Sequence, residues 1–188
     1  MPSLNADSII LPSEFDVANL TYGEPRVLET GGKAIFVSYT NKDGKKNPLI
    51  LQTPEMIAPF GLGCWKNDGG SCKYSIDLSF KGMDNREMLK KLFSGLRDFE
   101  KKIISDAFAN SQAWLKKSFK SEEFVEALST PIVKFPKDKN GEVTDKYPPT
   151  FKASVPFKDG KFDCDVYDKN QNLIDLSGID LKGARVTA

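Results

Sequence analysis

The sequence predicts a mainly β fold, either a small barrel or an α+β domain, with one long helix and one short helix inserted between strands. Three observations predict it. Short runs rich in β-branched and aromatic residues recur along the chain, one apolar stripe repeats at helical spacing, and strands and helices do not alternate regularly. The 188 residues are 39% hydrophobic, which is enough apolar material for one core.

The N-terminal third is expected to hold an extended arm, a hairpin and a loop. Residues 1–19 are polar and contain prolines, which is typical of an arm. Lys33–Thr40 and Pro48–Thr53 are apolar runs on either side of the polar turn NKDGKKN, so they predict a hairpin. Residues 54–71 contain two prolines and four glycines, and we expect an ordered loop there.

The middle of the chain carries the clearest strand and the clearest helix. Lys73–Gly82 alternates between polar and apolar residues, so it predicts a strand with one buried and one wet face. Asp84 as N-cap, with Glu87 three residues later, opens a helix that runs to Trp114 or Leu115. Its stripe, which we interpret as packing, consists of Leu89, Leu92, Phe93, Leu96, Phe99, Ile103, Ala107 and Phe108.

The C-terminal part returns to short strands. Ser121 opens a short helix over Phe124–Leu128, and Thr130–Phe135 is expected to contain the next strand. Lys146–Asp168 predicts two short strands around the turn Lys158–Lys161, with lysines and aromatic residues interleaved along both. That stretch can be a core hairpin with a solvated face or a surface for bases and phosphates.

Several classes of chemistry are disfavoured by what the sequence lacks. The chain has no histidine, so the Ser-His-Asp and Cys-His arrangements are absent and a zinc site would be short of ligands. Residues 23–34 contain glycines and a lysine, but not in the order of a phosphate-binding loop. We therefore expect no enzyme, no cofactor and no metal. Cys64, Cys72 and Cys164 show no CxxC spacing, and we expect free thiols in a reducing compartment.

Neither a membrane span nor a signal peptide is indicated. No run approaches about 18 apolar residues, and the first residues lack the basic and apolar regions of a signal sequence. We therefore expect an intracellular protein.

Charge is distributed unevenly, although the whole chain is nearly neutral. The net charge is +1, yet Lys73–Lys120 holds nine Lys and two Arg against six acidic residues, about +5. Such clusters are mostly solvated surfaces. Here aromatic residues lie among the lysines, and lysines can follow phosphates while flat side chains stack on unpaired bases.

The candidate nucleic-acid contacts fall into two chemical classes. The candidates for phosphate contacts are Lys73 and Lys81 on the polar strand face, and Lys134, Lys146 and Lys152 near the C-terminal hairpin. The candidates for base stacking are Trp65 and Tyr147. Phe151 and Phe157 alternate with polar residues, which favours core positions for both.

Three segments carry a resemblance to a known family, in this order along the chain. They are GSCKYSIDLSFKG at 70–82, TPIVKFPKDKNGEVTDKYPPTFKASVPFKDGKFDCDVYDKNQNLID at 130–175 and LKGARVTA at 181–188, with the long helix between the first two. Together they resemble the single-stranded-DNA-binding proteins of nucleocytoplasmic large DNA viruses of algae. More distantly they are similar to the single-strand-binding protein of short-tailed phages, which has the same order of elements.

The resemblance implies an OB-fold-like Greek-key barrel over residues 20–188, which follows the arm over residues 1–19. Such barrels bind oligonucleotides across one sheet face. The implied function is sequence-independent single-stranded-DNA binding in viral DNA replication or recombination. Implied partners are single-stranded DNA, replication proteins or a homo-oligomer, with no membrane, in the host nucleus, a cytoplasmic viral factory or the virion. Members of that family continue with further strands, which we expect beyond Ala188 or from another chain.

A structural or assembly protein of the virion is the alternative. Such a protein would use an OB-like barrel for protein–protein contacts, and the near-neutral net charge suits it. A basic groove with exposed Trp or Tyr would favour DNA binding. A large apolar patch or an unpaired strand edge would favour a protein partner.

Overall fold

The computed structural model describes residues 8–29, 31–66, 70 and 72–188, and its elements confirm the mainly β class with an inserted long helix. The chain divides into two compact units. The first takes in the residues up to Pro54, Asp84–Ile132 and Ala188, and the second takes in Glu55–Met83 and Val133–Thr187. Each unit is therefore assembled from stretches that lie far apart in the sequence.

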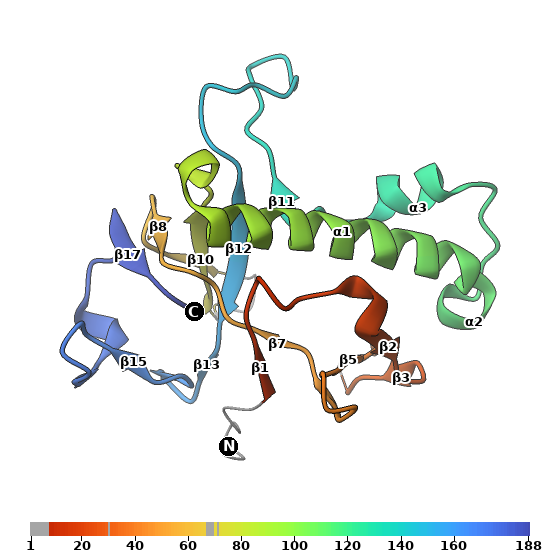
Figure 1. Ribbon diagram of the computed structural model, residues 1–188, viewed down its shortest axis with the longest axis horizontal. Coiled ribbons are helices and arrows are strands. Elements are labelled where there is room, and N and C mark those ends of the chain that lie inside the picture. The colour runs from red at the N-terminus through yellow and green to blue at the C-terminus, as the bar shows by residue number, and fades with distance from the viewer. Residues whose placement is uncertain (1–7, 30, 67–69, 71) are drawn as a thin grey trace. The chain divides into compact units, whose positions relative to one another are not determined.

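A six-stranded antiparallel sheet dominates the second unit (Figure 1). The strands are β8 (Met56–Ala58), β9 (Leu62–Lys66), β10 (Cys72–Ser79), β11 (Val133–Lys134), β12 (Thr150–Val155) and β17 (Ala184–Val186). Their order is β11-β12-β10-β8-β17, and β9 also pairs with β10. Since β11 and β17 each end this order, the described strands form an open sheet and do not close into a barrel.

Strand β10 alternates as the sequence predicts as far as Leu78, but Ser79, which is expected on the wet face, is buried. Ile76 and Leu78 are buried, whereas Lys73 is exposed. The register places Leu78 opposite Phe151 of β12, and Phe151 opposite the buried Val133 of β11. The side chains buried on this side stabilise the sheet, since fully burying one of this size contributes about 1.5–3 kcal/mol to the free energy of folding.

The loop expected over residues 54–71 is wrong for eight of its residues, because the three residues of β8 and the five of β9 lie within it. Met56 and Ala58 are fully buried. Gly61 makes the turn between the two strands: its φ is 69°, and a Cβ there would lie 2.9 Å from the backbone nitrogen of Lys182. Pro54, Pro59 and Gly61 thus lie outside the strands, whereas Gly63 lies within β9. Residues 67–69 and 71 of the expected loop lie outside the described residues.

Two small hairpins follow β12 in the same unit. β13 (Phe157–Lys158) and β14 (Lys161–Phe162) confirm the turn predicted between them. Asp159 and Gly160 form it with φ values of 50° and 80°, the positive values that a two-residue hairpin turn needs. β15 (Val166–Tyr167) and β16 (Leu173–Ile174) form the second hairpin. Strand β12 pairs with β10 instead of with these strands.

Short strands and α-helices build the first unit. Its strands are β1 (Ile9–Ile10), β2 (Leu20–Tyr22), β3 (Arg26–Val27), β4 (Lys33–Ala34), β5 (Val37–Thr40), β6 (Lys46–Pro48) and β7 (Ile50–Leu51). One core cluster consists of Ile10, Leu20 and Tyr39, against which Phe15 and Phe99 pack. The Tyr39 hydroxyl donates to the Glu14 carbonyl and accepts from the Asp16 N–H, both at 3.0 Å, so this buried polar group is satisfied.

The hairpin formed by β5 and β6 confirms the predicted turn, but its second strand begins at Lys46, two residues earlier than expected. Asn41 is the reason. Its side-chain oxygen accepts from the backbone N–H groups of Asp43 at 3.1 Å and Lys45 at 2.9 Å, which closes the turn early. Strand β7 instead pairs in parallel with β1, inside the expected arm. Residues 1–7 of that arm lie outside the described residues.

The helices are α1 (Glu87–Ala109), α2 (Ser111–Leu115) and α3 (Glu122–Leu128). Leu89, Leu92 and Leu96 of the predicted stripe are buried, and Ile104 is buried where Ile103 was expected. The interpretation of this stripe as packing fits that burial. Ser121 occupies the N-cap of α3, as predicted.

Both predicted ends of the long helix need correction. Asp84 lies in a short 3-10 turn, and Arg86 occupies the N-cap of α1. Glu87 forms an ion pair with Lys91 at 2.8 Å instead of acting in a capping box. At the other end, the side-chain amide of Asn110 donates to the carbonyl of Asp106 at 2.8 Å, and the helix stops there before α2 begins.

Three hairpin turns share one hydrogen-bond pattern. In each, the side-chain oxygen of the first residue accepts from the N–H groups two and four residues later. The turns are NKDGK at 41–45, DKNGE at 138–142 and DKNQN at 168–172. The fourth residue has a positive φ: 74° at Gly44, 84° at Gly141 and 64° at Gln171. Gln171 therefore carries a side chain in a conformation that favours glycine.

Candidate nucleic-acid interface

The six-stranded sheet has two sides of opposite character. We call the side with Lys73 and Asp77 the front face, and the side with Ile76 and Leu78 the back face. Residues paired across strands point to the same side, and every second residue of a strand shares a side. Lys73 lies opposite Trp65, and Asp77 lies opposite Lys152.

The register brings four of the seven predicted contact residues to the front face. Trp65 and Lys73 form one cross-strand pair, and Lys152 follows on β12. Lys134 joins them because it lies opposite Thr150, which itself lies opposite Ser79. All four predicted residues are exposed. Their side chains come from β9, β10, β12 and β11, so they extend across neighbouring strands.

Trp65 and Lys73 place a flat side chain directly opposite a cation on this face. Trp65 is 64% exposed, which is unusual for the largest apolar side chain. Its position on β9 leaves the indole free to meet a flat partner, while Lys73 lies directly across the ladder. This pair can offer a stacking platform and a positive charge within one cross-strand spacing.

Lys152 already has an acidic neighbour. Its Nζ lies 3.7 Å from Asp77 Oδ2, and both side chains are partly exposed. An ion pair in such a place contributes only about 0–1 kcal/mol to stability. The Asp77 carboxylate therefore lowers the positive charge of the front face and does little to hold the fold.

The remaining predicted residues lie at one end of the sheet and outside its strands. The Phe80 N–H donates to the Pro149 carbonyl at 2.9 Å, which joins the segment after β10 to the segment before β12. The prediction of Lys81 on the polar strand face is wrong, because β10 ends at Ser79; Lys81 follows Phe80 and is exposed. Lys146 lies over the ring of Tyr147, with its Nζ 5.5 Å from the centroid, and Tyr147 is 60% exposed. No strand pairing assigns these residues to the front face.

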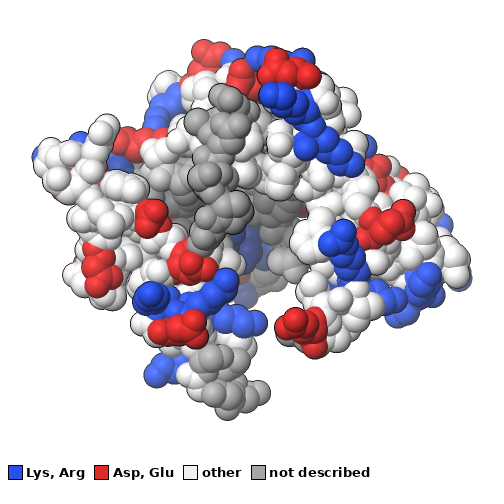
Figure 2. Space-filling view, turned by 90° about the horizontal axis from the view of Figure 1, so that it is seen from below, with Lys and Arg blue, Asp and Glu red and all other residues white. Residues whose placement is uncertain are grey.

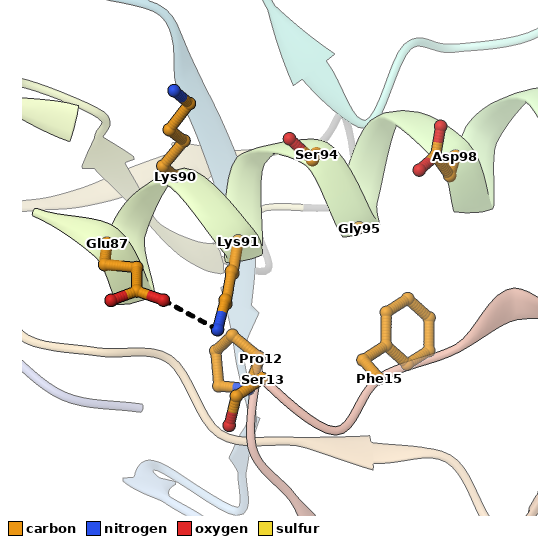
Figure 3. Close-up of a pocket in the computed structure, with 9 residues that line it drawn as sticks. All are labelled: Pro12, Ser13, Phe15, Glu87, Lys90, Lys91, Ser94, Gly95 and Asp98. Carbon is orange, nitrogen blue, oxygen red and sulfur yellow. Dashed lines mark ion pairs between the residues drawn. The ribbon is translucent and has the colours of Figure 1, made fainter. Parts of the chain in front are cut away.

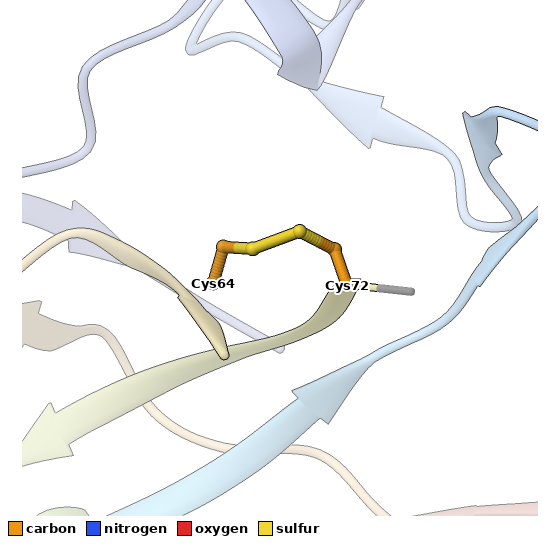
Figure 4. Close-up of a disulfide and its surroundings, with 2 residues drawn as sticks. All are labelled: Cys64 and Cys72. Atoms are coloured by element: carbon orange, nitrogen blue, oxygen red, sulfur yellow. A yellow bond between two sulfur atoms is a disulfide. The ribbon is translucent and has the colours of Figure 1, made fainter. Parts of the chain in front are cut away.

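A disulfide between Cys64 and Cys72 corrects the prediction of three free thiols (Figure 4). Cys64 lies opposite Tyr74 in the ladder, two residues along from Cys72, so both thiols point to the back face. Their Cα atoms are 5.7 Å apart, which suits a disulfide. The sequence does not indicate this disulfide, because residues 54–71 predict a loop where β9 lies. Cys164 is free and exposed.

A small cavity of about 180 Å³ lies beside this disulfide. Its lining consists of Cys72, Lys73, Tyr74, Ser154, Val155 and Phe157. The rings of Tyr74, Phe157 and Phe162 pack together, with centroids 4.7–5.1 Å apart. Phe151 and Phe157, for which the alternation predicts core positions, are both half-buried.

A larger open groove of about 440 Å³ lies in the first unit, between α1 and the segment that holds Pro12, Ser13 and Phe15 (Figure 3). Glu87 and Lys91 form an ion pair at its edge, and Lys90 and Asp98 add one charge of each sign. Phe15 forms part of its wall. A Cβ on Gly95 would lie 2.9 Å from the Phe15 ring, so a glycine suits this helix position. The mixed charges point to no particular ligand.

Charges of both signs are interspersed on the surface drawn in Figure 2. This agrees with the net charge of +1. Among the described residues, no three His, Cys, Asp or Glu side chains are grouped as a metal site would require. Within the same described ranges, no helix combines the length and apolar character that crossing a membrane needs.

Comparison with known proteins gives one viral similarity. A protein of Acanthamoeba polyphaga mimivirus, described as uncharacterized, is 35% identical over 95 residues. The match covers 48% of this chain and 16% of that protein, so this chain corresponds to a small part of a much longer relative. No family model matches the chain, and no solved structure matches it. The similarity supports a relationship to giant-virus proteins.

Proposed function

We propose that this protein binds single-stranded DNA without reading its sequence, in the replication or recombination of a large DNA virus. The observation that carries the proposal is the exposed Trp65 directly opposite Lys73, on a face that also bears Lys134 and Lys152. Lysines would neutralise phosphates and release counterions, while Trp65 would stack on a base. Lys81, Lys146 and Tyr147 would extend the contacts at one end of the sheet.

Titration of labelled oligo(dT) at several salt concentrations tests this proposal. Three to five neutralised phosphates predict that the logarithm of the binding constant falls against the logarithm of salt concentration with a slope of about −2 to −3.5. Duplex DNA of the same length should bind more weakly, because its bases cannot stack on Trp65. Absence of binding at about 50 mM salt would reject the proposal. Oligo(U) in the same assay decides between DNA and RNA.

A protein-contact role is the second candidate, and one observation favours it. Tyr167 and Leu173 lie opposite each other on β15 and β16 and are 58% and 64% exposed. Paired exposed apolar side chains of this kind suit the contact surface of a virion or assembly subunit. Sedimentation of the wild type and of the Leu173→Ser variant tests it: self-association that the variant abolishes supports this role, and a monomer at all concentrations opposes contact between copies.

A further inference from the structure

The disulfide between Cys64 and Cys72 holds the strand that presents Trp65. Strand β9 pairs with β10 and has no other partner among the described strands. Cys64 directly precedes Trp65, and Cys72 directly precedes Lys73. The covalent bond therefore crosses the ladder next to the Trp65–Lys73 pair, on the opposite side of the sheet.

Breaking this bond would allow β9 to move relative to β10, so that Trp65 and Lys73 would be held less firmly opposite each other. No front-face side chain would be removed. A disulfide restricts the freedom of the segment that it closes, and here that segment contains Trp65. An edge strand held by a few ladder hydrogen bonds is the kind of element that opens locally. If Trp65 and its strand have to be ordered when DNA binds, the conformational entropy lost in that ordering lowers the affinity.

The disulfide is placed where a reductant can reach it. Cys64 is exposed and Cys72 is half-buried. Reduction by a small dithiol is balanced: two electrons and two protons pass to the protein, two thiols form, and the dithiol becomes a cyclic disulfide. Desolvation, and then the carboxylates of Asp165 and Asp163, raise the pKa of the Cys164 thiol, so that thiol is a poor nucleophile for exchange.

We propose that the Cys64–Cys72 pair is a redox site that sets the affinity of the front face for single-stranded DNA, with tight binding in the disulfide form and weak binding in the dithiol form. This inference rests on the proposed function. It adds a means by which a bound strand is released when the disulfide is reduced. The two cysteines act by positioning Trp65 and Lys73, since they lie on the back face.

The test compares the oxidised protein with the protein kept reduced by a dithiol. Thiol titration should count one free thiol in the oxidised form and three in the reduced form. Anisotropy with labelled oligo(dT) should give about tenfold weaker binding after reduction, and reoxidation should restore it. The Cys64→Ser/Cys72→Ser double variant should bind like the reduced form under both conditions. The Cys164→Ser variant, which keeps the disulfide, should respond like the wild type.

A second readout separates this inference from the proposed function. In a Trp114→Phe background Trp65 is the remaining tryptophan, and reduction should increase the quenching of its fluorescence by acrylamide. Circular dichroism of the double variant checks that the fold persists. Equal binding by the oxidised and reduced forms overturns the redox inference and leaves DNA binding intact. Absence of binding by both forms overturns the proposed function, and the inference with it.

Discussion

Both faces of the six-stranded sheet carry an aromatic side chain, but the back face contributes to the core and the front face is exposed. On the back face, Leu78 and Val133 are buried and Phe151 is half-buried, and the burial of such side chains stabilises the unit. On the front face, Trp65 stays exposed beside Lys73, where it stabilises little. The alternating pattern of a strand therefore does not by itself tell which role an aromatic residue has. Its side of the sheet decides whether it serves the core or a partner.

The largest expected effect belongs to the back face. Leu78→Ala should lower the free energy of unfolding by about 2–5 kcal/mol, because the Leu78 side chain is fully buried and leaves a cavity. Urea denaturation followed by circular dichroism measures the change. At low urea, where the variant is still folded, its affinity for oligo(dT) should equal that of the wild type. A loss below about 1 kcal/mol would contradict the assignment of Leu78 to the core.

The next effect belongs to the front face and should appear in binding alone. Trp65→Ala should weaken oligo(dT) binding by about 1–3 kcal/mol through the lost base stack. Its free energy of unfolding should change by less than about 0.5 kcal/mol. Tyr167→Ala is the matched control, since Tyr167 is a similarly exposed aromatic residue on another hairpin of the same unit. Equal losses in the two variants would count against a specific role of Trp65.

A smaller effect should follow from removing one front-face charge. Lys73→Ala should weaken binding at low salt and reduce the magnitude of the salt slope by about 0.7, the share of one phosphate contact. Lys169→Ala removes the same charge from an exposed turn of the same unit. The same titrations measure both variants. A control variant with an equally reduced slope would mean that overall charge, and not the front face, governs binding.

Asp77→Asn should change binding in the opposite direction. The substitution removes the carboxylate 3.7 Å from Lys152 Nζ, so the lysine becomes fully available to phosphate. We expect a gain in affinity of roughly two- to fivefold at low salt, which disappears at high salt as the charges are screened. A loss of affinity would show that Asp77 is needed to hold Lys152 in place.

The smallest expected effect comes from a substitution in a hairpin turn, which belongs to neither face of the sheet. Gln171→Gly should raise the free energy of unfolding by up to about 1 kcal/mol, because Gln171 has a φ of 64° in a turn whose two counterparts carry glycine. Gly141→Ala in the equivalent turn should lower it by a similar amount. Thermal unfolding measures both, and oligo(dT) affinity should stay unchanged in each. A destabilised Gln171→Gly variant would mean that the Gln171 side chain makes a compensating contact.

Local patterns of the sequence predicted the strand faces and several helix positions. The alternation around Tyr74 identified the polar side of β10, because the side-chain period of a strand is local. The buried Leu92 and the N-cap Ser121 followed from helical spacing and capping chemistry in the same way. These features depend on neighbours within a few residues, so one sequence is enough to predict them.

Features that depend on pairing between distant segments could not be predicted from the sequence. The disulfide requires β9 to lie in a specific register against β10. The glycines around Cys64 predict a loop there and not a strand. The Lys152–Asp77 ion pair requires β12 to pair with β10, although the whole helical segment separates these two strands in the sequence. A register shift by one residue would move every side chain to the other face. The candidate residues could therefore be named from the sequence, but their common face could not.

Fluorescence of Trp65 in the Trp114→Phe variant provides the most direct measurement. Trp65 and Trp114 are the two tryptophans of the chain, and Trp114 packs against Tyr22 in the first unit. If the front face binds single-stranded DNA, oligo(dT) should quench Trp65 fluorescence to saturation, and added salt should reverse the quenching. Binding of oligo(dT) in anisotropy with Trp65 fluorescence unchanged would contradict this account, because the strand would then lie elsewhere on the protein.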